Sequence, residues 1–195
     1  MSRRSYTQDK RAEAAEETRR RIVQATFELH GEQGIAATSM KQIAQRAGVG
    51  VGTVYHHFPT YDDAITACGG MVLAIAPPPD RTMFDGLNSA RERIAAAVRT
   101  FYARYRQVPM IETARAEQQV SPALQGFFAA EAQGRAQLAR EAVGPADEGG
   151  EVARLAAGLL DIGVCSALAR AGLSPEAADR LVADFIGGRL PPDAP

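Results

Sequence analysis

The chain has 195 residues, of which 46% are hydrophobic and 23% charged, so it can bury a sizeable core and is not a wholly disordered protein. Its net charge of −1 excludes a polycation, and any contact with nucleic acid would therefore need a local basic patch. Aromatic residues are scarce, at 6%, and the remaining apolar residues favour packed helices over a β-sandwich.

The first predicted helix covers residues 12–33 and ends before Gly34. Its small and apolar residues recur at helical spacing, at Ile22, Ala25, Thr26 and Leu29. His30 continues this stripe, and we expect a histidine at the edge of the core with one ring nitrogen hydrogen-bonded. The basic residues upstream, Arg3, Arg4, Lys10 and Arg11, are expected to form a disordered basic arm.

Two short helices follow. One begins after an N-cap at Thr38 or Ser39 and ends at Gly48, and the other covers residues 51–58 and is stopped by Pro59. Buried positions are expected at Met40, Ile43, Ala44, Ala47, Val54 and Phe58. The two helices and the glycine turn between them form a helix-turn-helix pattern, in which the second helix inserts into the major groove of DNA.

The remaining elements predict a larger helical domain with no strand. Helices are expected over residues 62–75, from the capping box Ser89–Glu92, over 109–118, 122–143 and 151–171, and from Ser174-Pro175 to Gly187. Residues 191–195 are expected to form a frayed tail.

Residues around the glycine turn suit contact with DNA. Val51 can touch a thymine methyl group and Thr53 can bond base edges, whereas Tyr55, His56 and Lys41 suit phosphate oxygens. Small residues at 50 and 52 let the helix approach the groove. Residues 1–60 carry nine basic against six acidic residues, and this excess of positive charge marks the N-terminal third of the chain as the expected contact for a polyanion.

The pattern resembles the DNA-binding domain of the TetR family of transcriptional repressors. The resemblance covers residues 12–65 and is carried by Thr18–Ile22, Gly34 and the run from Ser39 to Phe58, which ends Gly-Thr-Val-Tyr-His-His-Phe. Three positions depart from the family: Gly50 replaces a capping residue, Tyr61 replaces a lysine that contacts a phosphate, and His30 replaces an aromatic residue such as Phe. We expect Tyr61 to contact the phosphate through its hydroxyl group.

The resemblance implies an all-α fold with a three-helix DNA-binding domain at residues 1–60 and a helical ligand-binding and dimerisation domain at 61–195. It also implies a homodimer that binds a palindromic double-stranded operator and is released by a small molecule. The residues expected to bind DNA are Ser39, Lys41, Gly50, Val51, Gly52, Thr53, Tyr55, His56 and Tyr61.

Two further sets of residues are candidates in the C-terminal part. The ligand-binding set is Met71, Phe84, Phe101, Tyr102, Tyr105, Met110, Phe127 and Phe128, for which a place in the packed core is the alternative. The dimer set comprises two stripes on the last two predicted helices, expected to pack as an antiparallel hairpin: Val152, Leu155, Leu159, Ile162, Leu181, Val182, Phe185 and Ile186.

Other function classes fit the sequence less well. Gly48, Gly50 and Gly52 only approach a dinucleotide-binding pattern, because Thr53 holds the place of the last glycine and a helix precedes the turn. We expect no catalytic residue, cofactor or metal site. A purely structural helical module would leave the glycine turn and the Tyr55-His56 pair unexplained.

The sequence also predicts the cellular compartment. Cys68 and Cys165 are far apart and make no disulfide framework, which is typical of a reduced protein. The start of the chain lacks the apolar segment of a secretory signal, and the apolar stretch at residues 67–76 is about half the roughly 20 residues of a membrane span. We expect a cytoplasmic protein with no membrane partner.

Overall fold

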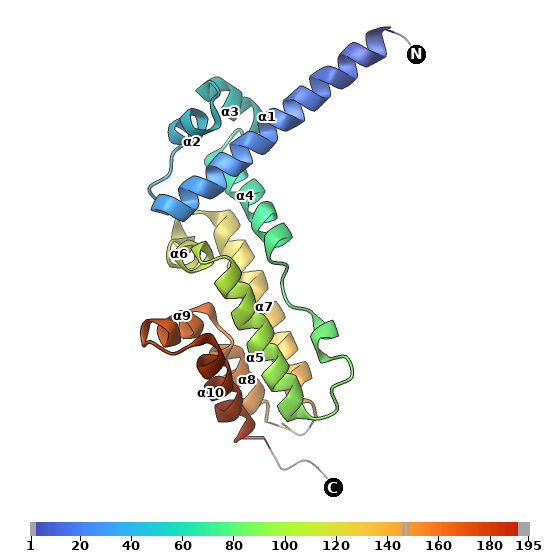
Figure 1. Cartoon of the computed structure of the whole chain (residues 1–195), viewed down its shortest axis with the longest axis vertical. Coiled ribbons are helices and arrows are strands. Elements are labelled where there is room, and N and C mark those ends of the chain that lie inside the picture. Colours follow the sequence, from blue (N-terminus) through green and yellow to red (C-terminus); the bar gives the residue numbers. More distant parts are fainter. Residues whose placement is uncertain (1–2, 146, 148, 191–195) are drawn as a thin grey trace.

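The computed structural model describes residues 3–145, 147 and 149–190, and this part of the chain forms ten α-helices, two short 3₁₀ helices and no strand. The predicted all-α class is confirmed. The N-terminal helices lie at one end of the elongated molecule, and the C-terminal helices form a bundle below them (Figure 1). Their bounds are α1 (Arg3–Gln33), α2 (Met40–Ala47), α3 (Val51–His57), α4 (Tyr61–Ile75), α5 (Ala90–Gln107), α6 (Met110–Ala116), α7 (Pro122–Val143), α8 (Glu151–Leu159), α9 (Ile162–Arg170) and α10 (Pro175–Gly187).

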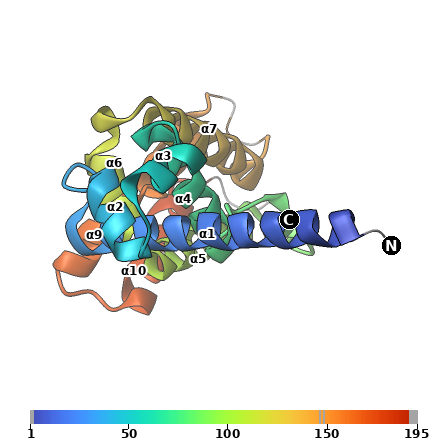
Figure 2. The same ribbon diagram turned by 90° about the horizontal axis from the view of Figure 1, so that it is seen from above.

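Helix α1 begins at Arg3, well before the predicted start at residue 12, and its N-terminal half projects from the body of the molecule (Figures 1 and 2). Lys10 and Arg11 therefore lie on a helix and not in a disordered arm. The cause is local, because residues 8–17 are rich in Ala, Glu, Lys and Arg, which favour helix without tertiary contacts. The side chains of Arg3 and Arg4 and the tail at 191–195 lie outside the described residues.

The first hydrophobic core joins α1, α2, α3 and the start of α4. It contains Ile22, Ala25, Leu29, Met40, Ile43, Ala44, Ala47, Val54, Phe58 and Ala64. Both ends of α2 are fixed by local chemistry. The Ser39 and Gln42 side chains form a capping box at its start, and Gly48 ends it in the left-handed conformation, at φ 67°.

The second and larger core lies within the bundle of α5, α7, α8 and α10. Helix α4 links the two cores, because Ala64 belongs to the first and Ile65 and Val72 belong to the second. Tyr61 packs against both cores. The start of α4 is therefore shared between the two halves of the molecule.

The prediction of a single helix over residues 151–171 is wrong. The structure has two helices there, α8 and α9, which meet at a bend of 56°. Asp161 sits at the break and caps α9 by accepting a hydrogen bond from the Gly163 amide at 2.8 Å. The same carboxylate pairs with Arg115 and Arg135. These tertiary partners stabilise a helix start that the apolar periodicity of the segment does not reveal.

No single helix within the described ranges is long and apolar enough to cross a bilayer. The bent pair α8 and α9 meets the criteria of length and composition only when the two helices are taken together. Both cysteines, Cys68 and Cys165, are buried free thiols.

Candidate DNA-binding surface and ligand cavity

Helix α3 presents an exposed face that the first core holds in place. Val54 and Phe58 are buried on its inner side, whereas Val51 and Tyr55 are 45% and 50% exposed on its outer side. Gly52 and His56 are also exposed, and Thr53 is half-buried. A short helix with one buried face and an exposed face of small, apolar and aromatic groups has the form of a helix that enters a groove of DNA.

Helix α2 is fixed against α1 by an ion pair network. Arg46 pairs with Glu32 at 2.7 Å and with Glu28 at 3.3 Å, and both carboxylates belong to α1. Lys41 is exposed near the start of α2. The Ser39 hydroxyl donates to Oε1 of Gln42 at 2.7 Å, so this predicted DNA-binding group is already engaged in the capping box.

Gly50 is the N-cap of α3 and provides no side-chain cap, as its glycine identity requires. The backbone at Gly50 and Gly52 is exposed, and a β-carbon at Gly52 would meet no heavy atom within 4 Å. The two positions leave open space on the side of α3 that we predict to face DNA.

The structure does not direct Tyr61 to a phosphate. Its hydroxyl donates a hydrogen bond to the carbonyl oxygen of Ile35 at 2.7 Å and lies 2.9 Å from Nε2 of His30. Burial raises the pKa of Tyr61 above its usual value. The phenol is therefore an internal link between α4, the end of α1 and the loop after it, and this replaces the expected phosphate contact.

His30 lies where the sequence predicts, at the edge of the core with one ring nitrogen bonded. It is 2% exposed, and burial lowers its pKa to about 4, so the ring is neutral at pH 7. The bond that it makes to Tyr61 joins the DNA-binding helices to α4.

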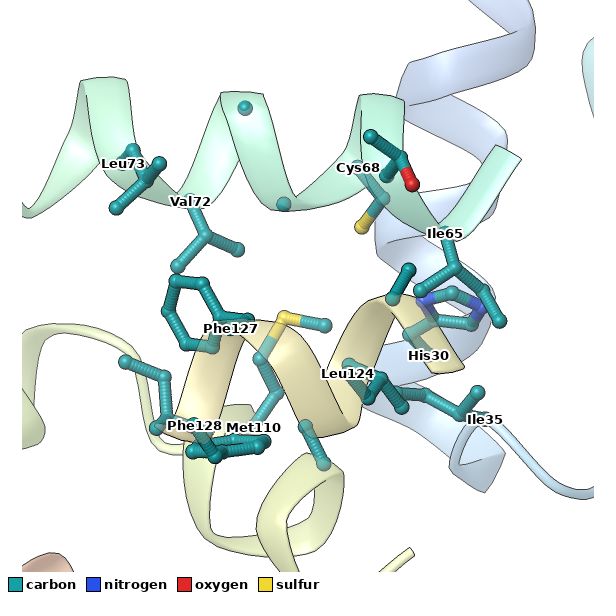
Figure 3. A pocket seen from close by; sticks show the side chains of 16 residues that line it. His30, Ile35, Ile65, Cys68, Val72, Leu73, Met110, Leu124, Phe127 and Phe128 are labelled. Atoms are coloured by element: carbon teal, nitrogen blue, oxygen red, sulfur yellow. The ribbon is translucent and has the colours of Figure 1, made fainter. Parts of the chain in front are cut away.

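A cavity of about 520 Å³ lies beside this histidine, between α4, α6 and α7 (Figure 3). Val72 and Leu73 come from α4, Met110 from α6, and Phe127 and Phe128 from α7, while His30 and Ile35 close one end. The volume falls within the range of roughly 300–1,000 Å³ that is usual for small-molecule sites.

The cavity includes only part of the predicted ligand-binding set. Met110, Phe127 and Phe128 line it. Phe101 and Tyr102 are buried in the second core instead, where the Tyr102 hydroxyl donates to the Leu159 carbonyl at 2.7 Å. Tyr105 donates to the Leu160 carbonyl at 3.2 Å and borders a smaller cavity of about 260 Å³, whereas Met71 and Phe84 are half-buried away from the main cavity.

Several lining residues escaped the sequence prediction, notably His30, Ile35, Cys68 and Leu124. Aromatic content guided that prediction, but these residues are aliphatic, polar or close to the DNA-binding motif. The glycine pair at 69–70, on the wall formed by α4, was the only local pattern on this helix that marked it as unusual.

The carboxylate of Glu117 forms hydrogen bonds with the loop between α1 and α2. Glu117 directly follows α6, and its Oε2 atom accepts hydrogen bonds from the amides of Ile35 at 2.6 Å and Ala36 at 3.0 Å. Gly34 has a φ of 86°, and a β-carbon there would lie 2.8 Å from the same carboxylate. A side chain at residue 34 would therefore be strained by the backbone conformation and would push the carboxylate of Glu117 aside.

The predicted dimer stripes divide between the interior and the surface. Val182 and Ile186 are buried in the second core, as is Ile162 on α9. Leu181 and Phe185 are 53% and 46% exposed on α10. Val152, Leu155 and Leu159 on α8 are half-buried.

Comparison with known proteins relates part of the N-terminal region to a family. Residues 22–63 match the family described as bacterial regulatory proteins, tetR family. The chain is 49% identical to the transcriptional regulator SrpR of Pseudomonas putida over 49 residues, which are 25% of this chain and 23% of SrpR. It is 43% identical to the repressor KstR of Mycolicibacterium smegmatis over 49 residues, which are 25% of this chain and 24% of KstR.

A longer match reaches 81 residues, at 32% identity to the regulator BetI 1 of Chromohalobacter salexigens, and covers 41% of this chain and 40% of that protein. The chain thus spans about a quarter to two fifths of the curated relatives that it matches. These relatives are transcriptional regulators and not enzymes.

Solved structures resemble the whole chain in fold. The multidrug binding protein EbrR, complexed with imidazole, has a TM-score of 0.63 and 24% identity, with 92% of this chain and 93% of that one covered. A putative transcriptional regulator from Saccharomonospora viridis, in complex with choline, has a TM-score of 0.66 and 19% identity, with 90% and 98% covered. At this level of identity the likeness establishes the arrangement of the helices.

Proposed function

We propose that this chain, whose N-terminal helices belong to the tetR family of bacterial regulatory proteins, is a transcriptional repressor that a small molecule releases from its operator. The observation that carries the proposal is the exposed outer face of α3, held on a well-packed core at the position of a recognition helix. We divide the chain functionally at residue 60, with DNA binding before it and ligand binding and dimerisation after it. Action on chromosomal DNA places the protein in the cytoplasm.

Two copies of α3 would read two half-sites of a palindrome. The exposed side chains Leu181 and Phe185 on α10 support a homodimer built from α8 and α10 of each copy, because large apolar groups at a protein surface mark interfaces. A twofold axis would place the recognition helices in successive major grooves, about 34–36 Å apart. Tethering then makes the second contact intramolecular and raises the affinity.

The ligand would occupy the cavity between α4, α6 and α7. Two solved structures of similar fold are complexed with small molecules, imidazole in one and choline in the other, which supports a ligand site in this chain. In this chain His30 and Ile35 line the cavity from the DNA-binding side, and they are hydrogen-bonded to Tyr61 of α4 and to Glu117 at the end of α6. A ligand that moves α4 or α6 would therefore act on the DNA-binding helices. Release requires that the ligand bind more tightly to the conformation that does not fit DNA.

Selection of bound sequences from a random duplex pool tests the central claim. We expect a palindromic consensus, and fluorescence anisotropy with that duplex should show binding that weakens steeply as salt rises. A pool that shows no enrichment would contradict DNA recognition. The selected duplex then serves in every release experiment below.

A further inference from the structure

The walls of the main cavity carry no formal charge. None of its sixteen lining residues is Asp, Glu, Lys or Arg. The polar side chains are His30, Thr66 and Cys68, and each is neutral at pH 7. Burial lowers the pKa of His30 to about 4 and raises that of Cys68 to about 12. An ion that moves from water to such walls would lose part of its hydration and gain no partner of opposite charge.

Glu117 lies close to His30 but is not a wall of the cavity. Its carboxylate is committed to the amides of Ile35 and Ala36. The Thr66 hydroxyl gives its hydrogen to the carbonyl oxygen of Asp62 at 2.9 Å and is exposed, so water competes for its remaining lone pairs. Among the described residues, His30 is therefore the main polar group that a ligand in the cavity can use.

The hydrogen-bond chain fixes the tautomer of His30. A carbonyl oxygen only accepts, so the hydrogen of the Tyr61 hydroxyl must point to Ile35. The Tyr61 oxygen then accepts from Nε2–H of His30, which leaves Nδ1 as the unprotonated nitrogen of the ring. No hydrogen bond to Nδ1 is found within the described part of the chain. The ring forms the end of the cavity in Figure 3 and offers it an acceptor.

We propose that the effector is an uncharged, largely apolar molecule with one hydroxyl group that donates a hydrogen bond to His30. This inference rests on the proposed ligand-released repressor and names the class of ligand for its cavity. The two phenylalanines, packed edge to face with ring centroids 5.1 Å apart, would contact the apolar body of the ligand. The hydroxyl would lie at the His30 end, against the DNA-binding helices.

Two charged classes are the competing occupants. An organic cation would have the faces of two phenylalanines but no carboxylate and no cage of several rings. A carboxylate would require His30 to take up a proton in a buried place that disfavours it. Ligands that share one alkyl chain and differ only in the head group can therefore distinguish an alcohol from a cation and from a carboxylate.

Four ligands with the same octyl chain test the proposal on the full-length protein: 1-octanol, methyl octyl ether, octanoate and octyltrimethylammonium. Each displaces the neutral fluorescent probe N-phenyl-1-naphthylamine, and the dissociation constants are compared. We expect 1-octanol to bind about tenfold or more tightly than either ion, because a buried unpaired charge is so costly. It should bind about fivefold more tightly than the ether, which lacks the donor.

Two variants locate the hydrogen bond. His30→Phe keeps a ring but removes the acceptor, and the preference for the alcohol over the ether should fall to about one. Thr66→Val is the matched control, because it removes the exposed hydroxyl group of the cavity wall and leaves His30 in place, and it should keep the preference. Thermal melts establish that both variants are folded before binding is compared.

The proposal is overturned if either ion binds as tightly as 1-octanol, if neither the probe nor any of the four ligands binds, or if the hydroxyl preference survives in His30→Phe. Operator binding is measured on the same preparations. A protein that binds no duplex but keeps the head-group order contradicts the repressor function alone. A protein that binds its operator but shows no head-group preference contradicts the ligand class alone.

Discussion

Single side chains on α2 and α3 divide into two kinds of DNA contact. Val51 and Thr53 lie in the first turn of α3, where base edges are read, whereas Lys41, Tyr55 and His56 suit the phosphate backbone. Phosphate oxygens carry no sequence information, so the two groups should behave differently when mutated.

We predict that Thr53→Ala and Val51→Ala change the selected consensus, while Tyr55→Phe, His56→Ala and Lys41→Ala weaken all duplexes alike. Loss of Lys41 should also lower the slope of log affinity against log salt by about one. Anisotropy titrations with consensus and mismatched duplexes measure both effects. If all five variants bind within twofold of the parent on every duplex, α3 does not dock in this way.

The buried histidine makes stability depend on pH. The pKa of His30 is about 4 in the folded protein and near 6.5 when exposed, so the unfolded chain binds the proton more readily between these values. The contribution is fully present above pH 6.5 and is lost as the pH falls toward 4. Between pH 7 and pH 5 the parent should lose about 2 kcal/mol more unfolding free energy than His30→Phe. Urea unfolding at both pH values measures this difference, and equal losses would show that His30 does not titrate as a buried group.

At the scale of the element, α4 carries two consecutive glycines at its centre, on the wall of the cavity. Glycine costs an interior helix position about 1 kcal/mol relative to alanine, and a β-carbon at Gly69 or Gly70 would meet no heavy atom within 4 Å. Packing therefore does not require either glycine. A helix that must bend when ligand binds would explain the pair.

We predict that Gly69→Ala with Gly70→Ala stabilises the protein, keeps operator affinity and raises the concentration of ligand needed for release. Gly134→Ala in α7 is the control, because this exposed glycine also has free space and lies off the cavity. It should stabilise α7 and leave release unchanged. The test is to measure release of the selected duplex as the ligand concentration rises. Identical curves for the double variant and the parent would show that α4 does not bend at the glycines.

The elements were predictable where local chemistry marks their ends. Ser39, Gly48, Pro59, Ser89 and Ser121 define starts and stops that the chain itself reveals. The break between α8 and α9 was not predictable, because Arg115 and Arg135 reach Asp161 from other helices. The same holds for the cavity, since the contact between Glu117 and Ile35 joins residues 82 positions apart.

At the scale of the whole molecule, Glu117 connects the helices that line the cavity with the DNA-binding helices. We predict that Glu117→Ala leaves ligand and operator affinity nearly intact but weakens the effect of one on the other. The loss of two hydrogen bonds to a carboxylate should also cost about 1–3 kcal/mol of stability. Glu112→Ala, in the helix that Glu117 follows, removes an exposed pair with Arg170 and a hydrogen bond with Ser166 but no contact with the DNA-binding helices, and serves as the control. Unchanged release by ligand in Glu117→Ala would show that coupling runs through α4 instead.

The dimer is the second prediction at this scale. Leu181→Glu with Phe185→Glu should give folded monomers that bind operator poorly, since both side chains are exposed in the single chain and their loss leaves its core intact. Val120→Glu is the matched control, an exposed apolar residue outside α8 and α10. Light scattering measures the mass of each variant in solution, and thermal melts establish that each variant is folded. A parent protein that is monomeric at micromolar concentration would remove the dimer from the mechanism.

His30 lies in a helix of the DNA-binding unit and also at the end of the cavity. This position makes the response to the ligand depend on the number of operator copies in the cell. Linkage is reciprocal, so if the ligand weakens operator binding by some factor, the operator weakens ligand binding by the same factor, typically 5–150-fold. A chromosome or plasmid with many copies of the operator would then hold more of the protein in its poorly sensing form. Extra operator copies would shift the response to higher effector concentrations, and the sensitivity of the switch would be set by the genome as well as by the protein.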